Sequence, residues 1–105
     1  MGPERITFEE AAIAEAERSR DWYAQRSLRA SHEFLDELAR AFEQIAAAPE
    51  SWPPYLHGTR RFICHGYPFF VVYRVFPDHV HVVAVAHAKR KPSYWSSRAE
   101  GASSE

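Results

Sequence analysis

Hydrophobic residues recur with two different periods along this chain, and the period changes near residue 49. Before that point apolar residues are spaced three or four positions apart, as on one face of a helix. The spacing predicts a first helix over residues 8–26, whose apolar face is made of small residues, and a second over residues 27–48. The apolar face of the second helix carries larger residues, among them Phe34, Leu38, Phe42 and Ile45.

Short sequence signals mark the ends of these helices. Thr7 and Glu10 have the spacing of a capping box, which predicts the start of the first helix. Ser27 is a suitable cap for the second helix, and Pro49 ends it. Because only a few residues join the two helices, we expect an antiparallel hairpin. Residues 5–6, before the first helix, are expected to add a short strand.

After a proline-rich loop over residues 49–59, side chains alternate as they do in strands. The alternation predicts strands over residues 60–65, 69–76 and 79–87, joined by turns. Pro92 prevents the following segment from continuing as a regular central strand. We therefore expect an α+β fold of order β-α-α-β-β-β, with the helix hairpin packed on a small antiparallel sheet.

Pairing of Phe76 with His79 would give the last two strands one wholly apolar face. This face would carry Phe69, Val71, Tyr73, Val75, Val80, Val82, Ala84 and Ala86. We expect the helix hairpin to cover it and to bury Leu38 and Val82.

The opposite face of the same two strands mixes apolar and basic residues. It would carry Phe70, Val72, Arg74, Phe76, His79, His81, Val83, Val85 and His87. A mixed face of this kind is poorly suited to free water, so we expect it to bind a partner.

The length of 105 residues allows one domain, predicted over residues 1–98, followed by a disordered tail over residues 99–105. The longest apolar run, residues 67–73, is too short to span a bilayer. No secretory signal opens the chain, which predicts a cytoplasmic protein. The single cysteine, Cys64, is expected to be a buried small hydrophobe rather than a nucleophile.

The formal net charge of −1 hides an uneven distribution. Residues 1–56 contain six Lys or Arg against eleven Asp or Glu. Residues 57–98 contain seven Lys or Arg against one acidic residue, Asp78, and five of the six histidines. A basic second half indicates an anionic partner, although solvation of two different surfaces would give the same pattern.

Basic and aromatic residues of the second half form the strongest candidate site. Cations there would neutralise phosphates, and an aromatic ring would stack on a base. The predicted target-binding residues are Arg60, Arg61, Arg74, Lys89, Arg90, Lys91, Tyr94, Trp95 and Arg98. The alternative is that Tyr94 and Trp95 pack the tail onto the core while the cations stay solvated.

No metal site or cofactor is expected. His79 and His81 lie on one face of a strand, but no Asp, Glu or Cys lies nearby in sequence to complete a metal shell. The four glycines are scattered, so no glycine-rich loop is available to hold phosphates.

The order and spacing of several segments resemble the RelE/ParE superfamily of toxins. The segments are Trp22-Tyr23, Phe34-Leu35, Gly58 with Arg60-Arg61, the run from Tyr67 to Val75, and the run from Ala84 to Trp95. The resemblance covers roughly residues 4–98. It implies the toxin of a bacterial type II toxin–antitoxin pair, a class linked to plasmid stabilisation, with a cognate antitoxin protein as its partner.

The resemblance implies two possible targets. ParE-like members inhibit DNA gyrase, without known nuclease chemistry. RelE-like members are metal-free mRNA interferases that cleave messenger RNA on the ribosome. They place a catalytic arginine at the position that Phe70 occupies here, so the sequence favours the ParE-like action.

The interferase remains the alternative, and its candidate catalytic residues are His87, Arg90, Tyr94 and Arg61. Either Arg61 or Arg74 would have to replace the arginine that is missing at Phe70. A second alternative is a nucleic-acid-binding module without toxicity.

The resemblance also suggests what covers the mixed face of the sheet. The antitoxin is predicted to bind its four apolar residues, which are Phe70, Val72, Val83 and Val85. Apolar groups beside cations are typical of protein interfaces.

Overall fold

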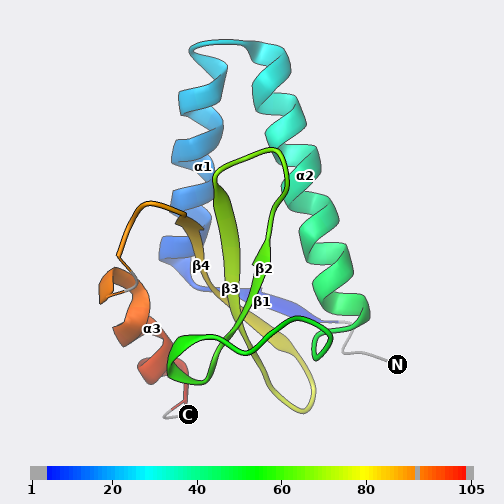
Figure 1. The fold of residues 1–105 in the computed structure, drawn as a ribbon, viewed down its shortest axis with the longest axis vertical. Coiled ribbons are helices and arrows are strands. Elements are labelled where there is room, and N and C mark those ends of the chain that lie inside the picture. Colours follow the sequence, from blue (N-terminus) through cyan, green and yellow to red (C-terminus); the bar gives the residue numbers. More distant parts are fainter. Residues whose placement is uncertain (1–4, 92, 104–105) are drawn as a thin grey trace.

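The fold is known from a computed structural model, which describes residues 5–91 and 93–103. A helix hairpin lies on a four-stranded sheet, and a third helix follows the last strand (Figure 1). The elements are β1 (Ile6–Phe8), α1 (Glu10–Ala24), α2 (Leu28–Ala47), the 3₁₀ turn η1 (Leu56–Gly58), β2 (Arg60–Ile63), β3 (Phe69–Val75), β4 (Val80–His87) and α3 (Ser93–Ser103). The predicted α+β fold and its β-α-α-β-β-β order are confirmed.

The sheet has the strand order β1-β4-β3-β2. β2, β3 and β4 are antiparallel neighbours, but β1 pairs with β4 in parallel, with Ile6 opposite Val80. The predicted antiparallel sheet is present in β2, β3 and β4, and β1 adds a parallel strand at the β4 edge, which makes the whole sheet mixed.

One of the two predicted helix starts is confirmed. The Ser27 hydroxyl accepts a hydrogen bond from the Ala30 N–H at 3.2 Å, so Ser27 caps α2. The capping box at Thr7 was wrong, because Glu9 occupies the N-cap position of α1. Thr7 lies in β1 instead, where its hydroxyl shares a hydrogen bond of 2.7 Å with His81 Nδ1.

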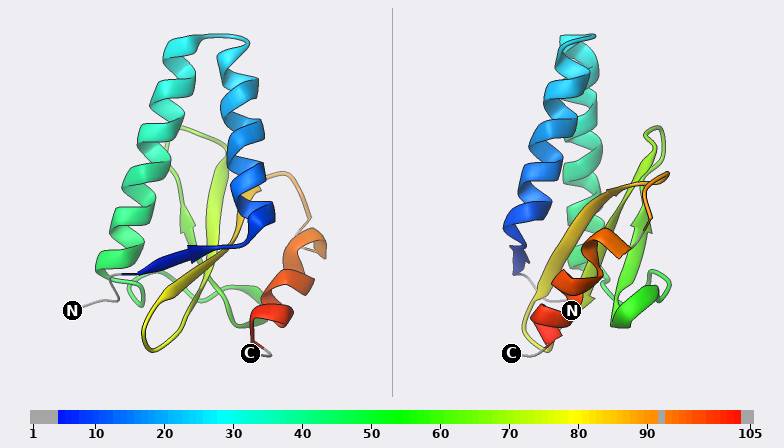
Figure 2. Two further views of the ribbon diagram at one scale, coloured as in Figure 1. Left: turned by 180° about the vertical axis from the view of Figure 1, so that it is seen from behind. Right: turned by 90° about the vertical axis from the view of Figure 1, so that its left-hand side faces the viewer.

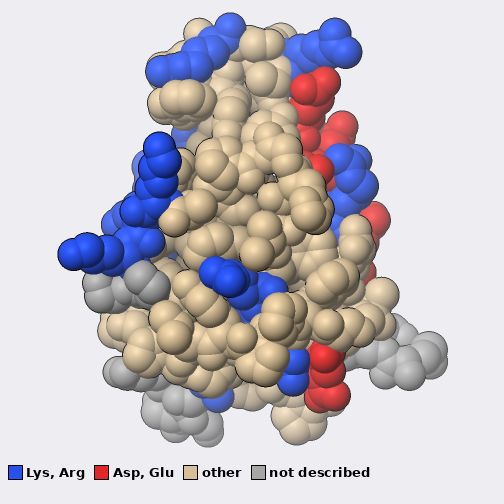
Figure 3. All heavy atoms as spheres, in the orientation of Figure 1, with Lys and Arg blue, Asp and Glu red and all other residues tan. Residues whose placement is uncertain are grey.

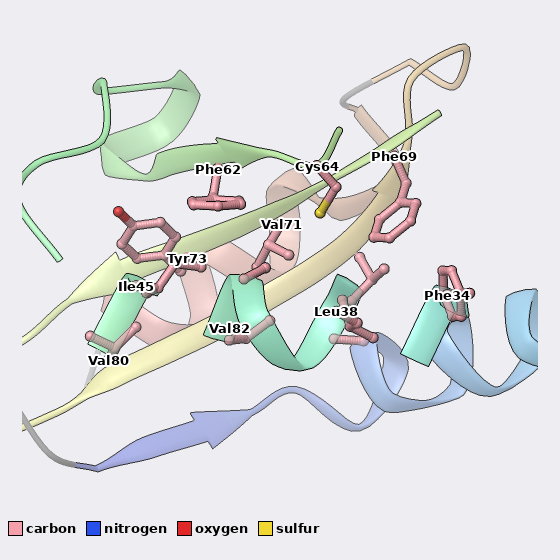
Figure 4. Close-up of a cluster of buried hydrophobic side chains, with 13 residues drawn as sticks. Phe34, Leu38, Ile45, Phe62, Cys64, Phe69, Val71, Tyr73, Val80 and Val82 are labelled. Carbon is pink, nitrogen blue, oxygen red and sulfur yellow. The ribbon is translucent and has the colours of Figure 1, made fainter. Parts of the chain in front are cut away.

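The core lies between the helix hairpin and one face of the sheet (Figure 4). As expected, Leu38 and Val82 are buried, at 5% and 0% exposure. Tyr73 is fully buried and its hydroxyl donates to the Pro49 carbonyl at 2.7 Å. Burial raises the pKa of Tyr73 to about 12.

Cys64 is buried in the same cluster, as predicted. Burial, with a smaller effect of Glu37, raises the pKa of its thiol to about 12.

The predicted pairing of β3 with β4 holds only near their connecting turn. Tyr73 lies opposite Val82, but Val72 lies opposite Ala84, so β4 contains one extra residue at Val83. A β-bulge of this kind reverses the alternation of side chains beyond it. Ala84 is therefore buried on the face away from the hairpin, and Val85 is buried on the hairpin face. Ala86 lies on the same face as Ala84. The predicted faces of Ala84, Val85 and Ala86 were therefore wrong.

The second face of the sheet is covered by the chain itself. Figure 2 shows α3 and η1 on the side of the sheet opposite the hairpin. Trp95 and Ala99 of α3 are fully buried, and they pack in one cluster with Phe70, Val72, Val83, Ala84 and Ala86. The tail predicted to be disordered is thus helical through Ser103, and residues 104–105 lie outside the described residues.

This arrangement corrects the predicted antitoxin surface. Phe70, Val72 and Val83 are buried beneath α3 and η1, and Val85 is buried on the hairpin face. The four side chains are therefore not exposed for docking.

Candidate functional site

The nine predicted target-binding residues do not form one surface. Five of them lie on the β4–α3 connection and on α3: Lys89, Arg90, Lys91, Tyr94 and Arg98. Three others, Arg60, Arg61 and Arg74, lie on β2 and β3 beside η1. The ninth, Trp95, is fully buried, at 0% exposure. It anchors α3 through rings such as Tyr55, 5.8 Å away between centroids, so it has no surface on which a base would stack.

The three arginines beside η1 are engaged with the chain itself. Arg60 donates to the Trp52 carbonyl at 2.6 Å and to the Glu50 carbonyl at 3.3 Å. The Arg61 guanidinium lies over the Tyr55 ring, 4.3 Å from its centroid. Arg74 donates to the carbonyl of His57 at 3.3 Å. These contacts hold the loop before β2 against the sheet.

A cleft of about 400 Å³ lies where α1, the end of β4 and the start of α3 meet. His87, Arg90 and Tyr94, three of the four residues proposed for catalysis, line it. The fourth, Arg61, does not line it. The rest of its wall comes from α1, α2, the turn before β3, β3 and β4, and comprises Glu15, Arg18, Ser19, Trp22, Tyr23, Phe34, Pro68, Phe69 and Val85.

The bulge in β4 brings His87 to this cleft. Strict alternation from Val82 would have turned His87 to the face that α3 covers. The extra residue turns both Val85 and His87 towards α1 instead. The Nδ1 atom of His87 accepts a hydrogen bond of 3.1 Å from the N–H of Lys89, so the neutral ring carries its proton on Nε2.

A buried carboxylate ties the walls of the cleft together. Glu15, on α1, is 6% exposed, and its Oε1 accepts a hydrogen bond of 3.0 Å from the N–H of Val85 beside the bulge. Its Oε2 lies 3.0 Å from Arg98 Nη2, a contact that is an ion pair rather than a well-directed hydrogen bond. Arg98 also donates to the Val83 carbonyl at 3.3 Å. Glu15 and Arg98 therefore hold α3 to α1 and to the bulge.

Tyr94 lies among four charged groups. Burial, followed by the charge of Glu15, raises the pKa of its phenol, while Arg90, Arg98 and Arg18 oppose that shift. The Arg90 guanidinium lies over the Tyr94 ring, 3.7 Å from its centroid. With its pKa raised, the phenol keeps its proton at neutral pH and remains a hydrogen-bond donor.

The sequence interpretation did not include α1 in the site. Glu15, Arg18 and Trp22 follow one another at helical spacing on α1, and all three line the cleft. The sequence signal that could have indicated α1 was Glu15, a glutamate beside the small residues of the first helix. A carboxylate buried there requires a partner.

Phe70 lies where the interferase resemblance requires an arginine. Its side chain is 8% exposed and packs edge-on against Tyr55, with 5.8 Å between ring centroids. Neither Arg61 nor Arg74, the two possible replacements, lines the cleft that holds His87, Arg90 and Tyr94.

On the face shown in Figure 3, basic side chains gather on the side of α1 and the β4–α3 connection, and acidic side chains, interspersed with basic ones, gather on the α2 side. The acidic residues of α2 are Glu33, Asp36, Glu37 and Glu43, and the basic residues of the connection are Lys89, Arg90 and Lys91.

Across residues 5–91 and 93–103, no three His, Cys, Asp or Glu residues are grouped as metal ligands. None of the described helices combines the length and the apolar character needed to cross a membrane.

Residues 6–92 match the family model described as the ParE toxin of the type II toxin–antitoxin system parDE. The chain belongs to this toxin family. Its partner is therefore an antitoxin, as the resemblance implied. η1 lies within the matched residues, and α3 follows them.

Among solved structures, the ParE-family chain is similar to one from the chromosomal ParDE toxin–antitoxin system of P. aeruginosa. The TM-score is 0.66 at 14% sequence identity, and the match covers 81% of this chain and 96% of the other. At this identity the likeness concerns the fold. No curated protein matches this chain in sequence.

Proposed function

We propose that this ParE-family toxin arrests growth in the cytoplasm by inhibiting DNA gyrase, and that its antitoxin restrains it. Membership of the family supports this target, because ParE-like toxins act on gyrase. The observation that favours gyrase over the ribosome as the target is Phe70. A buried phenyl ring at this position supplies no positive charge for the crowded phosphate of an RNA cleavage reaction.

The β4–α3 connection is proposed to contact the target. Lys89, Arg90 and Lys91 are exposed and adjacent, and no described acidic residue forms an ion pair with them. Exposed charges of one sign steer an oppositely charged partner, and salt screens that attraction. Target binding should therefore weaken as the salt concentration rises.

A supercoiling assay with purified gyrase tests the proposal. The toxin should inhibit supercoiling, and Lys89→Ala/Arg90→Ala/Lys91→Ala should weaken that inhibition by lost contacts. Arg29→Ala and Arg40→Ala, on α2, serve as controls because these arginines are exposed and pair only with Glu33 and Glu37. Full supercoiling activity in the presence of folded, growth-arresting toxin would contradict the proposal.

One observation keeps the mRNA interferase as a second candidate. His87, Arg90 and Tyr94, which the interferase would use, do line one cleft. In that case His87→Ala or Tyr94→Phe should lower the rate of messenger RNA cleavage by about 10²–10⁴-fold while ribosome binding persists. Ribosome-dependent cuts that His87→Ala abolishes would favour this candidate over gyrase.

A further inference from the structure

The cleft between α1 and α3 has free hydrogen-bond donors and no free carboxylate. Both oxygens of Glu15 are engaged, one with the Val85 N–H and one with Arg98. The Nδ1 acceptor of His87 is occupied by the N–H of Lys89, which leaves the Nε2–H to donate. Tyr94 keeps its phenolic proton at neutral pH.

Two arginines add positive charge to these donors. Within the described residues, Arg18 and Arg90 form no ion pair with a carboxylate, and both line the cleft. Arg18 comes from α1 and Arg90 from the β4–α3 connection, so the positive charge reaches the cleft from two separate segments. A site built from cations and neutral donors matches a ligand that carries several acceptor oxygens and negative charge.

The remaining wall of the cleft is aromatic. Trp22, Tyr23, Phe34 and Phe69 line it, and Trp22 is 51% exposed. Tyr23 lies edge-on to Trp22, with 5.0 Å between their ring centroids, and the Arg26 guanidinium lies over the Trp22 ring at 3.5 Å from its centroid. A base would therefore stack on the opposite face of Trp22. Flat apolar rings favour a flat ligand, because aromatic stacking and apolar burial act together. The cleft volume of about 400 Å³ also lies in the range of small-molecule sites.

We propose that this cleft binds a nucleoside phosphate, with the phosphate at Arg18, His87 and Arg90 and the base against Trp22 and Tyr23. An inorganic anion would leave the aromatic wall unused, and a neutral nucleoside would leave the cations unused. The proposal concerns binding alone and goes beyond the proposed action on gyrase. The phosphate belongs either to a free nucleotide or to the end of a single-stranded nucleic acid.

The isolated chain should be titrated with AMP, adenosine and inorganic phosphate, following amide and indole NMR shifts. AMP should move the Trp22 indole and bind about tenfold or more tightly than either fragment, because only AMP uses both parts of the site. A 5′-phosphorylated oligonucleotide identifies the source: tighter binding than AMP indicates a strand end, and equal binding indicates a free nucleotide.

Matched variants on one helix test the site residues. Arg18→Ala should weaken AMP binding about tenfold or more. Arg20→Ala should not weaken it, because Arg20 lies outside this cleft and pairs with Asp21. Arg18 is exposed, so the variant should keep the wild-type circular dichroism, and Trp22→Ala gives a second test from the aromatic wall.

Several results would overturn the proposal. They are the absence of AMP binding at millimolar concentration, equal affinity for phosphate alone, preference for an acidic peptide over AMP, or equal losses in Arg18→Ala and Arg20→Ala. The titration contains no gyrase and no ribosome. Its failure is therefore distinguishable from failure of gyrase inhibition, which the supercoiling assay reports.

Discussion

The two faces of the sheet are covered in different ways. α1 and α2, of 15 and 20 residues, cover one face, and their core cluster includes Phe34, Leu38, Ile45 and Tyr73. The other face is covered by η1 and by α3, an 11-residue helix whose described side chains include the buried Trp95 and Ala99. We call the first the hairpin face of the sheet and the second the α3 face.

This difference indicates how stability is distributed. Regions with many buried apolar contacts open only when the whole protein unfolds, whereas regions with few open locally. The hairpin face is of the first kind. Among the described side chains, α3 is held by the buried Trp95 and Ala99, by the partly buried Tyr94 and by the ion pair of Glu15 with Arg98, so fewer large apolar side chains anchor it. The cleft lies beside the element that we expect to open first.

The largest effect is expected in the hairpin face. Leu38→Ala should lower the free energy of unfolding by about 2–5 kcal/mol, because the buried side chain leaves a cavity between α2 and the sheet. Urea denaturation followed by circular dichroism measures the loss. Leu35→Ala, on the same helix but 39% exposed, is the control and should cost clearly less.

A smaller effect is expected in the α3 face. Trp95→Ala should lower the free energy of unfolding by about 1–3 kcal/mol and should release α3 locally, because α3 is able to open without the hairpin face. Hydrogen exchange should show lost protection in α3 alone, and Cys64, in the hairpin-face core, should stay unreactive to thiol reagents. Fast labelling of Cys64 in this variant would mean that the two faces open together.

The ion pair of Glu15 with Arg98 should contribute less to the free energy of unfolding than Trp95 does. Glu15→Gln keeps an oxygen for the Val85 N–H but removes the charge that Arg98 requires. We expect a loss of about 1 kcal/mol and faster exchange in α3. Glu17→Gln, an exposed position on the same helix, is the control. No difference between the two variants would show that the ion pair does not hold α3.

Ionisation of the buried Cys64 and Tyr73 should change the stability of the protein only in alkaline solution. The pKa of Cys64 is raised from 9.0 to about 12, and that of Tyr73 from 10.0 to about 12. The folded state therefore holds these protons more tightly than the unfolded state. Stability should be unaffected below about pH 9 and should fall as the pH rises towards 12. Tyr73→Phe with Cys64→Ala should flatten this fall in urea titrations at stepped pH.

The sequence predicted the hairpin face well and the α3 face poorly. Long amphipathic segments such as α2 carry a strong periodic signal, so Leu38 was placed correctly. α3 carries a weak one: its buried residues Trp95 and Ala99 lie among small and polar neighbours. The bulge at Val83 has no signature in a run of valines and alanines, so the faces of Ala84 and Val85 were exchanged.

The cleft was predicted in part for a related reason. His87, Arg90 and Tyr94 are close in sequence and were grouped correctly, whereas α1 is distant in sequence and its contribution depends on packing. Trp95 was assigned to the target surface, but its neighbours alone do not show which side of a short helix is buried. Phe70 was informative from the sequence alone, because the choice between the ParE-like and the RelE-like action depended on the residue type at this one position.

The extra residue in β4 has a consequence for how this protein can change over generations. Deleting Val83 would leave Val82, Ala84, Val85, Ala86 and His87 in regular alternation, with Tyr73 still opposite Val82 and Val72 still opposite Ala84. Val85 would keep its place in the hairpin core, and His87 would keep its place in the cleft. A single-codon loss at this position would therefore remove the bulge without turning any later side chain. Homologues that are one residue shorter here should be aligned with the gap at the bulge.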